Sequence, residues 1–303
     1  VVTEEEYKKS ILYNTDRIKF QIFTALFGSV VLVIFTIGGL LNYLTQVVMD
    51  MTSSNVLGAV LLGLLLIIVE EIISIPISIY STFVIEERHG FNKTTRKTFV
   101  TDIFKGLLIS GAISSILYAT VIFIIISAGD LWWIYAFAAV FTLQAIIFFL
   151  YPVLIMPLFN KFEPLDDEQF KKPIEKLLEK VDFKSKGLFV MNASLRSTHG
   201  NAFFTGFGKN KRIVFFDTLL KTINPDEMEA ILGHELGHYK LGHIRKTLIS
   251  SLVFGFLGFY ILNEIFKSDN FFIAHGLENL TVYSKFLMFY LVIGSYTFFT
   301  KPI

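Results

Sequence analysis

Six long runs of apolar residues alternate with polar segments along the chain. They cover residues 20–44, 56–80, 106–127, 131–151, 247–266 and 280–299. About 20 consecutive apolar residues are enough for a helix to cross the hydrocarbon core of a bilayer. The pattern therefore predicts six transmembrane helices, with a tight turn at residues 128–130 between the third and the fourth.

One long polar section, residues 158–246, lies between the fourth and the fifth run. Proline is tolerated in the first turn of a helix, so Pro173 predicts an amphipathic helix that begins near Lys172. Its apolar face recurs at helical spacing and consists of Ile174, Leu177, Leu178 and Val181. Two strand-like stretches follow, residues 187–191 and 212–216, separated by a glycine-rich loop. The section therefore predicts a small α+β domain.

The polar section ends in a second predicted helix. Asn224 is a favourable N-cap, Pro225 suits the first helical position, and two acidic residues follow in the first turn. Gly233 and Gly237 lower the helix propensity, and they leave room for another group to approach the backbone.

The same helix carries a His-Glu-x-x-His pattern formed by His234, Glu235 and His238. Residues four apart share one helical face, so both imidazoles can point at one zinc ion. Glu235 can reach a metal-bound water without ligating the metal. Zinc lowers the pKa of that water, and a neighbouring carboxylate can take its proton as it attacks a carbonyl. The pattern predicts a zinc peptidase, and the alternative is a pair of surface histidines on an ordinary helix.

Composition agrees with a membrane protein. Of the 303 residues, 53% are hydrophobic and 17% are charged, whereas soluble proteins carry about a quarter charged residues. The net charge of +1 provides no field that would attract nucleic acid, so we expect the lipid bilayer as a partner and no nucleic acid. The chain has no cysteine, which excludes disulfides and cysteine-ligated metals.

Lysine and arginine gather in alternate loops. Four precede the first span, five lie between the second and the third, and fifteen between the fourth and the fifth, whereas the other loops hold none, none and one. The positive-inside rule therefore places the His-Glu-x-x-His helix on the cytosolic side. We expect the membrane to be that of the endoplasmic reticulum or the bacterial inner membrane.

Several blocks of the chain resemble the integral-membrane zinc metalloproteases known as type I CAAX prenyl endopeptidases. They occur in the order that the family shows and cover nearly the whole length. These blocks are residues 83–92, 157–162, 199–207, 209–219 and 234–238.

The resemblance implies an all-α integral-membrane protein, a multi-span helical barrel around an intramembrane chamber, with a small cytosolic α+β zinc metalloprotease domain. Members have seven spans, so we expect a seventh upstream of Val1. The implied domains are residues 1–157 with helices one to four, residues 158–246 with the metalloprotease domain, and residues 247–303 with helices five and six.

The resemblance also implies an activity. Such proteins cleave peptide bonds near the C-terminus of prenylated, CAAX-type substrates, and some relatives act on other membrane-delivered proteins. By position, His234 and His238 would be the zinc ligands and Glu235 the general base. Asn201 and Ala202 would lie on an edge strand that pairs with the substrate backbone. The alternative for Asn201 is a turn residue beside a glycine.

One part of the family pattern is missing. A catalytic zinc has three protein ligands, and the third ligand in this family is a Glu on a later helix. We expect this Glu past Ile303, which implies that the chain is a fragment. Glu86 and Glu87 are alternatives on the correct side of the membrane. Glu70 and Glu71 lie inside an apolar run, where ionisable residues often mark a transport path. A transporter or a non-catalytic scaffold is therefore the competing hypothesis.

Overall fold

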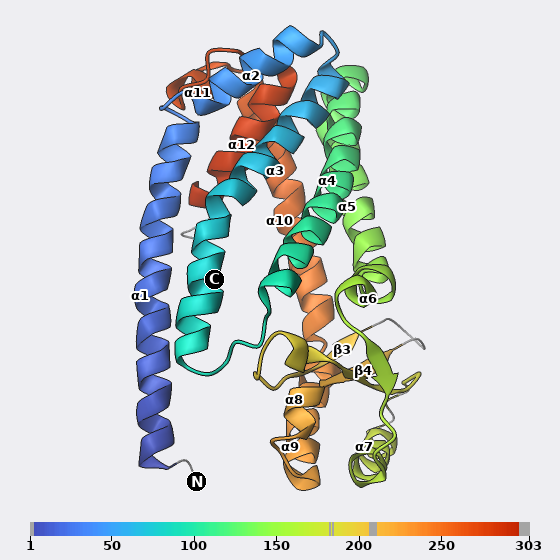
Figure 1. The fold of residues 1–303 in the computed structure, drawn as a ribbon. Helices are drawn as coiled ribbons and strands as arrows, with labels where there is room; N and C mark the ends of the chain where they lie inside the picture. Colours follow the sequence, from blue (N-terminus) through green and yellow to red (C-terminus); the bar gives the residue numbers. More distant parts are fainter. Residues whose placement is uncertain (1–2, 182, 184, 206–210, 297–303) are drawn as a thin grey trace. The chain divides into compact units, whose positions relative to one another are not determined.

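The computed structural model describes residues 3–181, 183, 185–205 and 211–296 (Figure 1). It divides into two compact units. The helical unit comprises Val1–Ser81, Gly106–Leu143 and Val253–Ile303, and the sheet unit comprises Thr82–Lys105 and Gln144–Leu252. The division into residues 1–157, 158–246 and 247–303 stays a prediction.

Most of the chain is helical, and helices of two other types interrupt or extend the α-helices. The α-helices are α1 Glu4–Phe35, α2 Leu40–Met51, α3 Asn55–Tyr80, α4 Arg96–Ser127, α5 Trp132–Leu150, α6 Met156–Phe159, α7 Glu168–Lys180, α8 Asp217–Leu220, α9 Pro225–Lys240, α10 His243–Phe266, α11 Asn270–Ala274 and α12 Val282–Tyr296. The π-helices are Ser81–Glu86 and Tyr151–Ile155, and the 3-10 helices are Gly129–Leu131 and Ala193–Leu195.

Within the described residues, five helices are long and apolar enough to cross a membrane. They are Glu4–Phe35, Asn55–Glu86, Arg96–Ser127, Gly129–Phe159 and Lys246–Phe266. These helices confirm the membrane class of the chain. The sixth predicted span contains α12, a shorter apolar helix, and its residues 297–299 lie outside the described part, so this span stays a prediction.

The predicted bounds of the first span, residues 20–44, are wrong. The α1 helix ends at Phe35, and α2 begins only after Gly39, whose φ is +80°. Glycine adopts this left-handed conformation without a steric cost. A Cβ on Gly38 would lie 2.6 Å from the carbonyl oxygen of Ile34. The hydrophobic pattern does not reveal this break, because the helices on both sides of it are apolar.

The predicted start of the amphipathic helix near Lys172 is also wrong. The α7 helix begins at Glu168, and the side chain of Asp167 caps it by accepting a hydrogen bond from the backbone of Gln169. Pro173 consequently lies inside the helix, where proline is unfavourable by about 3 kcal/mol. An apolar stripe that starts one turn earlier offsets this cost through burial. Its buried members are Phe170, Ile174 and Leu178.

The sheet unit is built around a four-stranded sheet in the order β1-β2-β4-β3. The strands are β1 Phe162–Pro164, β2 Leu188–Met191, β3 Ala202–Thr205 and β4 Arg212–Phe216. The central pair β2 and β4 is parallel, and both outer strands are antiparallel to their neighbours. The central pair confirms the two predicted strands, and the periodicity missed the two short outer ones.

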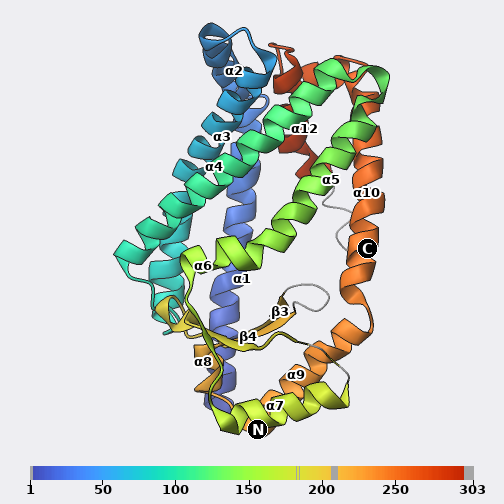
Figure 2. The same ribbon diagram turned by 90° about the vertical axis from the view of Figure 1, so that its right-hand side faces the viewer.

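Two helices cover one face of the sheet. The α7 and α9 helices lie side by side (Figure 2). Their buried side chains form one hydrophobic cluster with the sheet residues Leu188, Ile213 and Phe215. The outer strand β3 adds Ala202 and Phe204 to this cluster. The fold therefore holds α9 beneath the sheet, next to the strand that carries Ala202.

Candidate active site

The α9 helix begins where the sequence predicts. Asn224 and Glu227 cap it reciprocally: the backbone N–H of Glu227 donates to Asn224 Oδ1 at 2.9 Å, and that of Asn224 donates to Glu227 Oε2 at 3.0 Å. This arrangement satisfies two of the backbone N–H groups that a helix start leaves unpaired. A stripe of three buried side chains then attaches the helix to the sheet. These are Met228, Leu232 and Leu236.

The three residues of the His-Glu-x-x-His pattern lie on this helix. His234 is exposed. The backbone of Glu235 and His238 is helical, and their side chains lie outside the described part. A Cβ on Gly233 or Gly237 would meet no described atom within 4 Å. This agrees with the predicted room beside the backbone, which stays a prediction because several neighbouring side chains lie outside the described part.

The donor set suits zinc in its chemistry. Two imidazoles one helical turn apart supply the nitrogen donors that zinc takes in catalytic sites. Among the described residues, no group of three His, Cys, Asp or Glu could hold a metal. Glu86 Oε2 lies 3.2 Å from His199 Nε2, and Glu87 Oε2 accepts from Asn92 Nδ2 at 2.7 Å. A third ligand is therefore not identified in this part of the chain.

Glu70 and Glu71, on which the transporter hypothesis is based, lie in α3 of the helical unit. Glu70 is exposed and Glu71 is half-buried. Their role stays a prediction.

Asn201 and Ala202 lie where β3 starts, at the edge of the sheet. Among the described strands, β3 pairs with β4 alone. The N–H of Phe216 donates to the carbonyl of Asn201 at 2.9 Å. Because hydrogen-bonded and non-bonded pairs alternate along an antiparallel ladder, Ala202 and Phe204 direct their backbone groups away from β4. The N–H of Ala202 donates to Asn201 Oδ1 at 2.9 Å. The position on an edge strand agrees with the expectation, and the role in substrate binding stays a prediction.

The loop that precedes β3 is tied to the residues that follow β4. Asp217 accepts hydrogen bonds from the backbone N–H and the hydroxyl of Ser194. Burial alone would raise the pKa of Asp217, but the bonds from Ser194 and the charge of Lys221 outweigh it and lower the pKa. Thr218 Oγ1 donates to the carbonyl of His199 at 2.8 Å. These contacts fix the path of the loop towards β3.

We expect Ser194→Ala to lower the free energy of unfolding at pH 7 by about 2 kcal/mol, because the ionised Asp217 loses its hydroxyl donor. Because the pKa of the Asp217 carboxyl is lower in the folded than in the unfolded protein, its ionisation stabilises the folded state at pH values above the ordinary pKa of about 3.9. This stabilisation is lost as the pH falls through the pKa of the folded state. Thermal unfolding in detergent measures the difference at pH 7 and at pH 3. An equal difference at both pH values would contradict this assignment.

Comparison with known proteins agrees with these features. Residues 1–161 match the family model described as CAAX prenyl protease N-terminal, five membrane helices, and residues 164–301 match that of peptidase family M48. The chain belongs to the type I CAAX prenyl protease family. Among solved structures, the crystal structure of S. mikatae Ste24p is similar, with a TM-score of 0.89 and 30% identity. The match covers 97% of this chain and 73% of that one.

Curated relatives of this family have several eukaryotic sources. The CAAX prenyl protease 1 homolog of Arabidopsis thaliana is 42% identical over 220 residues, which cover 72% of this chain and 52% of the relative. CAAX prenyl protease 1 of Saccharomyces cerevisiae is 36% identical over 289 residues, which cover 91% and 63%. The Caenorhabditis elegans homolog is 32% identical over 324 residues, which cover 98% and 72%. The chain spans about half the length of the plant relative.

Proposed function

We propose that this protein is a membrane-embedded zinc endopeptidase that cleaves peptide bonds near the C-terminus of prenylated, CAAX-type substrates or of other membrane-delivered proteins. The observation that carries the proposal is the position of residues 234–238. They lie on a capped helix that packs beneath a sheet whose edge strand starts at Ala202. Membership of a metallopeptidase family supports the assignment.

In this proposal, His234 and His238 hold the zinc ion. When bound, the zinc would supply a Lewis acid that brings the pKa of a water ligand close to neutrality. Glu235 takes a proton from the water while the water oxygen forms a bond to the scissile carbonyl carbon. Glu235 then passes that proton to the leaving nitrogen as the C–N bond breaks.

The edge strand positions the substrate. The outward backbone groups of Ala202 and Phe204 pair with an extended peptide, as in other cases of strand addition to a sheet edge. The Asn201 side chain engages the Ala202 N–H in this structure, so substrate pairing would replace that hydrogen bond. Fixing the peptide in this way keeps its carbonyl beside the pattern on α9.

We also propose six spans, with the α9 pattern on the cytosolic side of the endoplasmic reticulum or the bacterial inner membrane. The alternating distribution of lysine and arginine supports this orientation.

The test is cleavage of a farnesylated peptide by the purified protein in lipid vesicles. We expect cleavage that a zinc chelator abolishes and that added zinc restores. The control is the same peptide without the lipid, which separates a requirement for the prenyl group from broader cleavage. Cleavage that is unchanged after complete removal of the metal would overturn the proposal. Absence of bound metal together with a solute-dependent effect of Glu70→Gln would favour the transporter hypothesis.

A further inference from the structure

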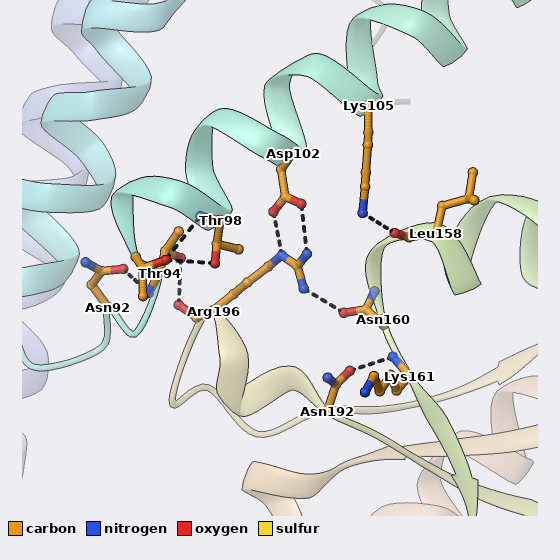
Figure 3. Close-up of polar contacts among 11 residues, drawn as sticks. Asn92, Thr94, Thr98, Asp102, Lys105, Leu158, Asn160, Lys161, Asn192 and Arg196 are labelled. Carbon is orange, nitrogen blue, oxygen red and sulfur yellow. Dashed lines mark hydrogen bonds and ion pairs between the residues drawn. The ribbon is translucent and has the colours of Figure 1, made fainter.

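A partly buried ion pair holds the middle of the loop that leads into β3. Arg196 donates to both carboxylate oxygens of Asp102, from Nε at 2.7 Å and from Nη2 at 2.9 Å (Figure 3). Its Nη1 also donates to Asn160 Oδ1 at 3.0 Å. Both charged side chains are only about a quarter exposed, at 25% for Arg196 and 24% for Asp102. A bidentate pair with this degree of burial fixes geometry more strongly than an exposed one.

The backbone at the same residue is held by the same segment of the chain. The carbonyl of Arg196 accepts from the backbone N–H of Lys93 at 3.0 Å and from Thr94 Oγ1 at 3.1 Å. One residue further along, Ser197 forms a β-bridge with Asn92. Arg196 is therefore bound through its side chain and its backbone to residues 92–102.

Contacts between the same two segments continue towards β3. The N–H of Thr198 donates to the carbonyl of Phe91 at 3.1 Å. The ring of His199 stacks on that of Phe91, with their centroids 4.3 Å apart. On the other side, a Cβ on Gly200 would lie 2.9 Å from Leu219 Cδ1. The exposed segment that leads to Asn201 is thus in contact with Phe91 through His199 and with Leu219 through Gly200.

This loop has no regular strand or α-helix that would hold it. Fixing the backbone of one residue costs about 1–2 kcal/mol of conformational entropy. A loop therefore needs other contacts, such as side-chain hydrogen bonds, to stay ordered. The contacts of Arg196 hold the middle of this loop, in addition to those of Ser194 and His199 with the residues that follow β4. Only arginine offers two parallel donors to one carboxylate and a third to Asn160.

We propose that Arg196, held by Asp102 and Asn160, is a positioning residue that fixes the start of β3 in register for substrate binding. The inference rests on the proposed function, in which Asn201, Ala202 and Phe204 form the substrate edge. Arg196 acts through the backbone of its loop and does not contact the substrate.

The test is Asp102→Asn in the full chain, which keeps the shape of the side chain and removes its charge. We expect KM for the farnesylated peptide to rise about tenfold, with kcat within about twofold and the zinc content unchanged. Exchanging the charges, with Asp102→Arg and Arg196→Asp together, should return KM towards the wild-type value. The matched control is Glu168→Gln, which removes an exposed ion pair with Lys172 in the same unit and should leave KM unchanged.

Hydrogen exchange measures the positioning without reference to activity. Amides of residues 198–205 should exchange faster in Asp102→Asn than in the wild type, whereas those of α9 should not change. If Asp102→Asn does not fold, Thr94→Val removes only the hydroxyl link to the Arg196 carbonyl and should accelerate the same exchange. Wild-type exchange in both variants, or faster exchange with an unchanged KM, would overturn the inference. A wild-type protein that neither binds zinc nor cleaves would refute the proposed function instead, and exchange would still decide whether Arg196 positions β3.

Discussion

Glu235→Gln is expected to lower kcat by about a thousandfold, because glutamine retains the shape of the side chain but cannot accept a proton from the attacking water. The zinc content should stay at the wild-type level, since the proposed role of Glu235 does not include ligation. Initial rates with the farnesylated peptide, together with metal analysis of the same preparation, measure both quantities.

The matched control for this variant is Glu229→Gln. Glu229 is an exposed acid on the same helix, and its substitution removes the same charge from α9. It should leave kcat within about twofold. A Glu235→Gln protein that retains a tenth or more of the wild-type kcat would contradict the role of Glu235 as the general base.

His234→Ala is expected to abolish both zinc binding and cleavage. Removing one imidazole leaves a site with fewer ligands than a catalytic zinc requires, and metal affinity falls with each lost donor. The helix itself should persist, because His234 is exposed and the buried stripe of α9 is unaffected. Zinc per chain and circular dichroism of the purified variant measure the two effects.

The control for the metal experiment is His89→Ala. His89 belongs to the sheet unit but to no predicted metal pattern. This variant should keep its zinc and its activity. Wild-type zinc content in His234→Ala would exclude this histidine as a ligand.

The membrane class and the helix that carries the His-Glu-x-x-His pattern were predictable because their signals are local. The length of an apolar run is enough to predict a transmembrane helix. The start of α9 was predicted from the N-cap Asn224 and from Pro225 at the first helical position. The pattern of His234, Glu235 and His238 required no knowledge of distant residues, since the four-residue spacing of the two histidines predicts a shared helical face.

Features that depend on distant residues were not predictable from local patterns. The strands β1 and β3 are too short for alternation to identify them, and β3 entered the analysis only through the family resemblance. Arg196 and Asp102 are 94 residues apart, so neither position carries a signal of the other. The end of α1 at Phe35 and the left-handed conformation of Gly39 before α2 are backbone features that hydrophobicity does not report.

The central claim is that His234 and His238 hold one zinc ion, and X-ray absorption at the zinc edge of the purified full chain tests it most directly. The account predicts about one zinc per chain, with at least two imidazole nitrogens at about 2.0–2.1 Å and loss of the signal in His234→Ala. Protein that is folded and free of zinc, or zinc whose spectrum contains no imidazole contribution, would contradict the account.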